Sequence, residues 1–416
     1  MTKLIEMAKN ATAVKAQLAQ LSEKQKNGAL AAIAKALREN TAQILAANDQ
    51  DIAAAQAAGM KESMQDRLKL DTVRIEGIAA AVEQLIELPD PVGKILSGET
   101  MKDGMRLINI RVPLGVVGII YESRPNVTVD AATLCLKSGN VCILKGGKEA
   151  IYSNTALMKI MRETLEECGL PADFMQLIED TSRAAAQELM GLAGYLDVLI
   201  PRGGAGLIQS VVENAKVPVI ETGTGNNHIY VDADADQAMA LTILDNAKTQ
   251  RPSVCNAVET LLVHQDIAEE FLPKAKALLD AHSVEWRGDE ITRQILGAQV
   301  LPVTNEDYQT EFIDYIMACK VVSDLEEAIA HIAEYGTGHS EAIVTKDYDR
   351  ANRFTNAVDA AAVYVNCSTR FTDGGEFGLG AEIGISTQKL HVRGPMGLEA
   401  LTSNKYMVLG SGQIRG

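Results

Sequence analysis

Apolar residues recur at helical spacing in the first ninety residues of the chain. Ile75, Ile78, Val82 and Leu85 form one stripe with intervals of three and four residues. Intervals of this kind place side chains on one face of a helix. The periodicity predicts a helical N-terminal region, and the proline- and glycine-containing segment 88–93 predicts the turn that closes it.

The pattern changes after residue 115, where short apolar runs alternate with helical patterns. This alternation predicts parallel strands joined by helical crossovers, and runs that are apolar throughout predict strands covered on both faces. The first series of strands is expected at 116–121, 141–144, 175–178, 196–200 and 217–220. The second series is expected at 229–231, 260–263, 318–322, 342–345 and 362–365. Intervening helices are expected at 127–137, 154–168, 182–192, 205–214, 266–279 and 325–334.

The length of the chain favours more than one domain, because 416 residues exceed what one hydrophobic core ordinarily organises. A Gly- and Asn-rich stretch at 221–232 separates the two series of strands. We therefore expect an α/β protein with two α/β domains built on parallel sheets, at residues 1–225 and 226–384. The tail at 385–416 combines strand-like pieces with several glycines, and we expect it to extend over a neighbouring subunit.

Charge and cysteine usage exclude several function classes. The formal net charge is -16, and so acidic a surface repels a phosphate backbone, which argues against a nucleic-acid partner. No apolar run reaches the roughly 18 residues that span a bilayer, and the charged start does not resemble a signal peptide. Six scattered cysteines without a CxxC pair fit a reducing cytosol and argue against a zinc site. We therefore expect a cytoplasmic protein with no metal.

Cys255 is the first candidate for chemistry, in the segment Arg251-Pro252-Ser253-Val254-Cys255-Asn256. A cysteine after a Pro-led turn and before a helix or strand is well placed for activation, since helix N-termini and nearby cations such as Arg251 favour the reactive thiolate. Most free cysteines are buried apolar residues, however, so this segment alone leaves both interpretations open.

Three further segments follow expected strands, where ligands of parallel sheets bind. Asn126 can donate its amide to an oxyanion, although Pro-Asn is also common in plain turns. Lys145-Gly146-Gly147-Lys148 combines cations with glycines and suits a phosphate, or is a solvated loop. Gly203 and Gly204 lie between a strand and a helix, where a helix N-terminus attracts phosphate.

Two other segments are ambiguous taken singly. The segment 221–228 looks like a broken GxGxxG fingerprint, but His228 replaces the third glycine and a strand is expected to follow. Glu221 at its start is a candidate base or orienting group. Arg370, in the loop after the last strand, can pair with a carboxylate or phosphate, or can simply be a surface arginine.

The order of these candidates resembles the aldehyde dehydrogenase superfamily. Asn126, Lys145, the Gly203 loop, Glu221 and Cys255 follow one another at strand ends, and Glu221 precedes Cys255 by 34 residues (255 minus 221), as in typical members. The resemblance implies that Asn126 is the oxyanion donor, Lys145 a cofactor contact and Cys255 the nucleophile. Glu311 loosely matches the superfamily glutamate that holds the nicotinamide ribose.

Longer motifs narrow the resemblance to one branch, the gamma-glutamyl phosphate reductase family. These motifs extend over most of the chain: VPLGVVGIIYESRPNVTVDAA, LKSGN, LKGGKEA, PRGGAGLI, ETGTGN, NCSTRFTDGGEFGLGAEIGIST and HVRGPMGLEALT. The resemblance implies NADPH-dependent reduction of L-glutamyl 5-phosphate to L-glutamate 5-semialdehyde, a step of proline synthesis, through a Cys255 thioester. It further implies a homo-oligomer assembled through strands at 104–114 and the tail, and a possible partnership with glutamate 5-kinase.

The substrate and cofactor assignments follow from the same resemblance. Arg124, Arg251 and Arg370 lie within or close to matched site motifs in the sequence and are expected to bind the substrate anions. Lys148 stands where NAD-preferring relatives carry a ribose-binding glutamate, and an ammonium there favours the 2′-phosphate of NADP+ or NADPH. Two alternatives remain: a hydrolytic NAD(P)-dependent semialdehyde dehydrogenase with Glu221 as its base, and a non-catalytic scaffold.

Overall fold

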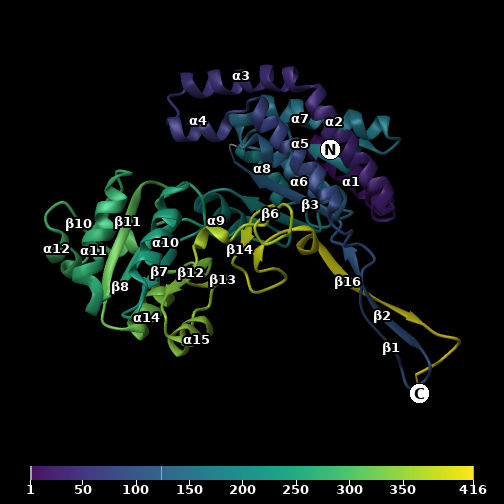
Figure 1. Cartoon of the computed structure of the whole chain (residues 1–416). Helices are drawn as coiled ribbons and strands as arrows, with labels where there is room; N and C mark the ends of the chain where they lie inside the picture. Colours follow the sequence, from purple (N-terminus) through teal and green to yellow (C-terminus); the bar gives the residue numbers. More distant parts are fainter. Residues whose placement is uncertain (1, 123, 416) are drawn as a thin grey trace. The chain divides into compact units, whose positions relative to one another are not determined.

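The structure is a computed structural model that describes residues 2–122 and 124–415 (Figure 1). The chain divides into two compact units. Unit 1 comprises Met1–Thr222, Gly378–Gly384 and Met396–Gly416. Unit 2 comprises Gly223–Phe377 and Ile385–Pro395. The C-terminal tail expected as one segment is thus shared between the two units.

Unit 1 is built on a parallel sheet with the strand order β5-β4-β3-β6. Every residue of β3 and β4 is buried, as expected for strands without a solvent-facing side. The strands are β3 (Val116–Tyr121), β4 (Val141–Lys145), β5 (Met175–Leu177) and β6 (Val198–Arg202). The helices that connect and follow them are α6 (Pro125–Lys137), η1 (Lys148–Ala150), α7 (Ile151–Glu167), η2 (Ala172–Phe174), α8 (Arg183–Met190) and α9 (Ala205–Asn214).

Five N-terminal helices pack onto this sheet unit. The apolar stripe read from the sequence is the buried face of α5, where Ile75, Ile78, Val82 and Leu85 are buried. Helix α2 packs on α5 and α7, α3 packs on α7, and α1 contacts β4. The helices are α1 (Lys3–Ala19), α2 (Glu23–Glu39), α3 (Thr41–Ala57), α4 (Glu62–Leu68) and α5 (Thr72–Glu87).

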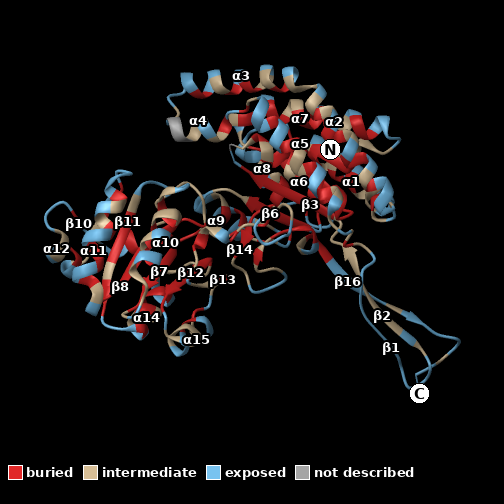
Figure 2. Cartoon of the chain, in the orientation of Figure 1, coloured by how far each residue is buried: buried red, intermediate tan, exposed pale blue. Residues whose placement is uncertain are grey.

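A three-stranded antiparallel ribbon extends from unit 1 in the order β1-β2-β16 (Figure 1). Its strands are β1 (Ile95–Thr100), β2 (Arg106–Pro113) and β16 (Thr402–Leu409), and the 3-10 helix η4 (Leu398–Leu401) leads into the last of them. The residues of β1 are all exposed, and most of β16 is exposed as well (Figure 2). The ribbon includes most of the segment 104–114 that was expected to form strands.

Unit 2 is built on a seven-stranded parallel sheet with the order β10-β9-β11-β8-β7-β12-β13. Its strands are β7 (Asn227–Val231), β8 (Val258–His264), β9 (Glu285–Gly288), β10 (Leu301–Pro302), β11 (Ile316–Val322), β12 (Ser340–Val344) and β13 (Ala362–Val365). Its helices are α10 (Gln237–Thr249), α11 (Gln265–Asp280), α12 (Glu290–Leu296), α13 (Asn305–Tyr308), α14 (Leu325–Tyr335), α15 (Tyr348–Ala357) and η3 (Thr369–Phe371). The short strands β14 (Ile385–Ser386) and β15 (Gly394–Pro395) pair separately.

Alternating residues of the central strands belong to two hydrophobic cores on opposite faces of this sheet. Figure 2 shows these central strands in the colour of buried residues. Ile229 and Val231 of β7 join the cluster that includes residues of α10 and α11, whereas Tyr230 joins the cluster that includes residues of α14 and α15. Successive side chains of a strand point to opposite faces of the sheet, and here both faces are buried. The strands are therefore continuous apolar runs in the sequence.

One predicted strand is wrong. The segment 217–220 forms only an isolated bridge between Leu199 and Val219. Pro218 has no backbone N–H, so it can accept the bond from the Leu199 N–H but cannot continue the ladder. The other predicted strands and helices are present within a few residues of the expected bounds. In the part of the chain that the structure describes, no helix is long and apolar enough to cross a membrane.

Candidate active site

Cys255 lies in a tight turn of unit 2 that leads directly into strand β8. The Ala257 N–H donates to the Val254 carbonyl oxygen at 3.1 Å, which closes a turn with Cys255 and Asn256 at its centre. The Cys255 side chain is half-buried. Since a strand rather than a helix follows the turn, the macrodipole of a following helix does not act on this thiol.

Two guanidinium groups lie near Cys255. Burial lowers the pKa of Arg370, the neighbouring Arg251 lowers it further, and Asp373 and Cys255 act in the opposite direction. Arg370 also donates through Nε to Gln250 Oε1 at 3.0 Å, just beyond the end of α10. An arginine stays protonated even in such a position. The structure therefore brings together three predicted site residues, Arg251, Cys255 and Arg370, and the pair of cations suits an anionic ligand.

Asn256 ties the Arg370 loop to the turn. Its Nδ2 donates to the carbonyl oxygens of Arg370 at 3.2 Å and Thr372 at 3.0 Å. In return, Thr369 Oγ1 donates to the Asn256 carbonyl oxygen at 2.7 Å. These reciprocal bonds hold the loop after β13 against the turn that contains Cys255. The position of Arg370 is therefore set by hydrogen bonds within unit 2.

Glu311 is held against the glycine-rich segment of the same unit. Its Oε1 accepts a hydrogen bond from the Gly225 N–H at 2.9 Å. Two residues further on, the Ile313 N–H donates to Oε1 of the buried Glu259 at 3.3 Å, and Glu259 Oε2 pairs with Lys248 Nζ at 2.6 Å. Glu311 thus lies on a segment that is hydrogen-bonded to Glu259 near the start of β8, four residues after Cys255 in the sequence.

The second group of predicted residues lies along the carboxyl edge of the unit 1 sheet. In the strand order β5-β4-β3-β6, the connection after β5 passes to the other side of β3, so the topological switch point lies between β3 and β6. Ligands of open α/β sheets bind outside the carboxyl ends of the strands at this point. Glu122 follows β3, Lys145 ends β4, and Gly203 follows β6.

Glycines of this edge lie close to neighbouring side chains. A Cβ at Gly203 would lie 2.6 Å from the Glu122 carboxyl group and 2.9 Å from Leu207. A Cβ at Gly146 would lie 2.2 Å from Asn154 Nδ2. Beside these glycines, burial lowers the pKa of Lys145, while Asp180 and Glu149 oppose the shift.

Glu122 was not among the residues predicted for the site. Its Oε2 accepts a hydrogen bond from the Gly204 N–H at 2.9 Å, at the N-terminus of α9. A carboxylate at this amide shows that the position binds an anion, as expected of a helix N-terminus. The sequence could have indicated Glu122, because this glutamate directly follows the apolar run that forms β3.

The remaining predicted residues also belong to unit 1. Asn126 lies in the first turn of α6 and donates through Nδ2 to Asp130 Oδ2 at 2.9 Å. Arg124 is the N-cap residue of α6 and is half-buried. Glu221 is half-buried beside Thr222, whose Oγ1 donates to the Pro201 carbonyl oxygen at 2.9 Å. Gly147 is the N-cap residue of η1, and Lys148 is exposed at its start.

These features fit a dinucleotide. The edge combines a switch point, glycines at 146, 147, 203 and 204 and the cations Lys145 and Lys148. Among the described residues, no group of His, Cys, Asp and Glu side chains has the arrangement of a metal site.

Comparisons with known proteins agree with this arrangement. The model of the aldehyde dehydrogenase family matches residues 2–316 and 300–386. Gamma-glutamyl phosphate reductase of Carboxydothermus hydrogenoformans is 59% identical over 416 residues, which is 100% of each chain. The crystal structure of gamma-glutamyl phosphate reductase from Thermotoga maritima superposes with a TM-score of 0.96 at 50% identity, covering 100% of both chains.

A more distant solved structure shares the fold. An engineered glycolyl-CoA reductase with bound NADP+ superposes with a TM-score of 0.71 at 15% identity, covering 97% of this chain and 96% of the other. The predicted aldehyde-dehydrogenase-like α/β fold is therefore confirmed. The chain belongs to the aldehyde dehydrogenase family and, within it, to the gamma-glutamyl phosphate reductases.

Proposed function

We propose that this enzyme reduces L-glutamyl 5-phosphate to L-glutamate 5-semialdehyde, releases inorganic phosphate and thereby serves proline synthesis. The proposal rests on the similarity of the whole chain to gamma-glutamyl phosphate reductases, at 59% identity to one relative and 50% to a solved structure. The half-buried Cys255 beside two arginines supports it. The nicotinamide cofactor, when bound, supplies the hydride.

Cys255 is the proposed nucleophile. Its thiolate attacks the C5 acyl carbon, and the carbonyl π electrons move onto oxygen. The Asn126 amide and the Cys255 N–H are assigned to this developing oxyanion. Collapse of the tetrahedral species expels phosphate, which leaves with the electron pair of the C–O bond, and a thioester to Cys255 remains. After reduction of that thioester, cleavage of the C–S bond regenerates the thiolate and releases the aldehyde.

The arginines are assigned to the anionic groups of the substrate. Arg251 and Arg370 lie near Cys255, so they are suited to the phosphate that leaves from the acyl carbon attacked by the Cys255 Sγ. Arg124 is assigned to a substrate anion as well. Glu221 is assigned an orienting or proton-handling role. Activation of water is not assigned to it, because water would hydrolyse the thioester. In the hydrolytic alternative, Glu221 would instead activate water.

NADPH is proposed as the cofactor in preference to NADH. Lys145, Gly146, Gly147, Lys148, Gly203 and Gly204 are assigned to its binding, and Glu311 to its nicotinamide ribose. Lys148 is an exposed cation at the start of η1, where an ammonium attracts the 2′-phosphate that distinguishes NADPH. We further propose a cytoplasmic homo-oligomer that uses the β1-β2-β16 ribbon, with glutamate 5-kinase as a possible partner.

Phosphate dependence of the reverse reaction tests the proposal. The enzyme is mixed with glutamate 5-semialdehyde and NADP+, and NADPH formation is followed with and without inorganic phosphate. A phosphate-requiring rate is expected, because phosphate must cleave the thioester. A rate that is indifferent to phosphate would favour hydrolysis, and no rate from folded protein would favour the non-catalytic scaffold.

A further inference from the structure

Two adjacent asparagines lie in the glycine-rich segment 221–228 and have no role in the chemistry proposed above. Asn226 and Asn227 are both fully buried, although Asn is usually a surface residue. A buried amide is costly unless its donors and acceptor are paired. The hydrogen-bond partners of these two side chains therefore indicate what each of them holds in place.

Asn227 pairs its amide with the backbone around the nucleophile candidate. Its Nδ2 donates to the carbonyl oxygens of Cys255 at 2.7 Å and Ala257 at 2.6 Å. Its Oδ1 accepts a hydrogen bond from the Ser340 N–H at 3.1 Å, at the start of β12. One side chain thus joins the first residues of β7 and β12 to the centre and the last residue of the Cys255 turn.

The backbone ladder is interrupted at this place. Strands β7 and β8 pair Asn227 with Val258 but the next residue, His228, with Thr260, so Glu259 is an extra residue on β8. Such a bulge leaves local backbone groups without their ladder partners. The Asn227 side chain binds the carbonyl groups of residues 255 and 257, which lie just before this irregular start of β8.

The same segment contacts the turn through its backbone. A Cβ on Gly225 would lie 1.5 Å from the Cys255 carbonyl oxygen and 2.7 Å from the Cys255 Cα. Only glycine allows so close an approach. The carbonyl of Cys255 is therefore confined by the Gly225 backbone and bound by the Asn227 amide.

We propose that Asn227 is the positioning residue of Cys255. By holding the carbonyl oxygens of residues 255 and 257, it sets the orientation of the turn, and with it the directions of the Cys255 Sγ and N–H. Asn227 acts through Cys255 and does not contact the substrate, so its loss lowers kcat and leaves KM nearly unchanged. This inference rests on the proposed role of Cys255 as nucleophile.

A general structural role would predict a different result, and the chain offers a matched control. Asn48 is buried in unit 1, donates through Nδ2 to the Leu68 carbonyl oxygen and to Ser153 Oγ, and accepts from the Leu70 N–H. It makes the same number of hydrogen bonds as Asn227, among residues with no assigned role in catalysis. Asn48→Asp therefore reports the effect of losing a buried amide alone.

The test compares Asn227→Asp with Asn48→Asp in the reverse assay. Asn227→Asp keeps the size and the acceptor but loses both donors, so kcat is expected to fall roughly 10- to 100-fold, with each KM within about threefold. Asn48→Asp is expected to keep kcat within about threefold per folded molecule, even if both variants melt at lower temperature. Equal kcat values for the two variants would overturn the inference.

If Asn227→Asp does not fold, Asn227→Ser, which keeps one donor, replaces it in the test. It is expected to show a smaller loss of kcat, and an unchanged kcat would overturn the inference.

A second readout does not depend on turnover. Alkylation by iodoacetamide is followed by mass spectrometry of the peptides that contain Cys255 and the exposed Cys168, which serves as reference within each sample. Asn227→Asp is expected to change the Cys255 rate relative to Cys168, and an unchanged ratio would contradict the proposal. Activity that persists in Cys255→Ala would refute the proposed nucleophile itself, whereas an inactive Cys255→Ala with a fully active Asn227→Asp would refute only the positioning role.

Discussion

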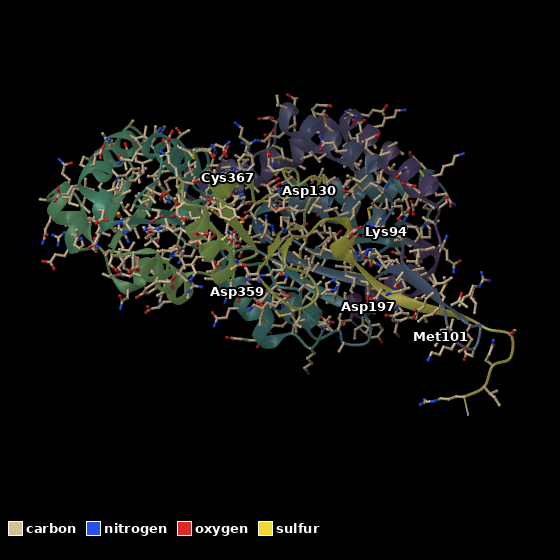
Figure 3. All side chains as sticks on the ribbon, turned by 60° about the horizontal axis from the view of Figure 1, so that its bottom comes forward. Lys94, Met101, Asp130, Asp197, Asp359 and Cys367 are labelled. Carbon is tan, nitrogen blue, oxygen red and sulfur yellow. The ribbon has the colours of Figure 1, made fainter. Side chains whose placement is uncertain are left out.

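Asn126 Nδ2 donates to Asp130 Oδ2 at 2.9 Å, so the proposed oxyanion donor is oriented by a carboxylate one turn further along α6. Figure 3 labels Asp130 among the side chains of unit 1. One N–H of the amide is engaged in this bond, which fixes the direction of the other. Burial raises the pKa of Asp130 to about 6, against the opposing effects of Asn126 and Arg202.

This relationship predicts a pH dependence of catalysis. Above about pH 6 the ionised Asp130 accepts from Asn126, and below it the protonated carboxyl group holds the amide less well. We expect kcat, measured at saturating substrates from pH 5 to pH 8, to fall on the acidic side with an inflection near pH 6. In Asp130→Asn this inflection should be absent, because an amide does not titrate. An inflection that survives the substitution would belong to another group.

The same group makes a small contribution to the pH dependence of stability, with a definite sign. The pKa of Asp130 is higher in the folded protein than the usual 3.8, so the folded state binds the proton more tightly. The stabilising contribution is present below pH 4 and is lost as the pH rises to about 6. Asp130→Asn should remove this component from the melting temperature measured across the same range.

Lys148 is predicted to select NADPH over NADH. Lys148→Glu replaces an ammonium by a carboxylate at the start of η1, which would repel a 2′-phosphate. The KM for NADPH should rise by about tenfold or more, the equivalent of about 1.4 kcal/mol, while the KM for NADH changes little. Lys159→Glu, the same charge change on the exposed surface of α7, is the control and should affect neither. Equal effects of Lys148→Glu on both cofactors would contradict the assignment.

The buried pair Lys248–Glu259 is predicted to be a strong determinant of stability in unit 2. Both side chains are fully buried and lie 2.6 Å apart, and burial raises the pKa of Glu259 to about 7 even beside Lys248. Lys248→Met leaves a buried carboxyl group without its cation, which typically costs about 3–5 kcal/mol. The melting temperature should therefore drop in Lys248→Met and largely recover in the double variant Lys248→Met/Glu259→Leu. A double variant no more stable than the single one would show that the pair is not the cause.

The ribbon β1-β2-β16 is predicted to mediate self-association. Tyr406 and Val408 of β16 are exposed apolar residues, with 61% and 53% of their surfaces accessible. Exposed apolar residues on an edge strand favour pairing with another chain. Tyr406→Lys/Val408→Lys should shift the sedimentation coefficient toward that of a monomer, whereas Tyr348→Lys, at an even more exposed aromatic on α15, should not. An oligomer unaffected by the double substitution would exclude this ribbon as the contact.

The strands of both sheets could be predicted because they are short apolar runs between helices. Tyr121 ends β3 as expected, whereas β4 ends at Lys145 and β6 at Arg202, one and two residues beyond the expected ends at 144 and 200. The segment 217–220 was mispredicted because its apolar character conceals the missing N–H of Pro218. An apolar pattern indicates which residues are buried. It does not indicate whether the backbone of a segment can make the hydrogen bonds of a β-ladder.

The contacts that shape the site are harder to read from sequence. Asn227 bonds to carbonyl groups 28 and 30 positions further along the chain, and no local pattern reveals such bonds. Glu122 binds the Gly204 N–H across 82 positions. Residue type and strand ends indicated which segments carry chemistry, whereas the hydrogen bonds that orient them depend on tertiary structure.

The most direct test of the central claim is the stoichiometry of phosphate and hydride transfer at Cys255. In one reaction containing glutamate 5-semialdehyde, NADP+ and phosphate, the NADPH formed and the phosphate consumed are both measured for wild type and Cys255→Ala. An acyl-phosphate reductase with this nucleophile predicts one phosphate consumed per NADPH in the wild type and neither in Cys255→Ala. NADPH formed without phosphate consumption, or undiminished turnover by Cys255→Ala, would contradict it.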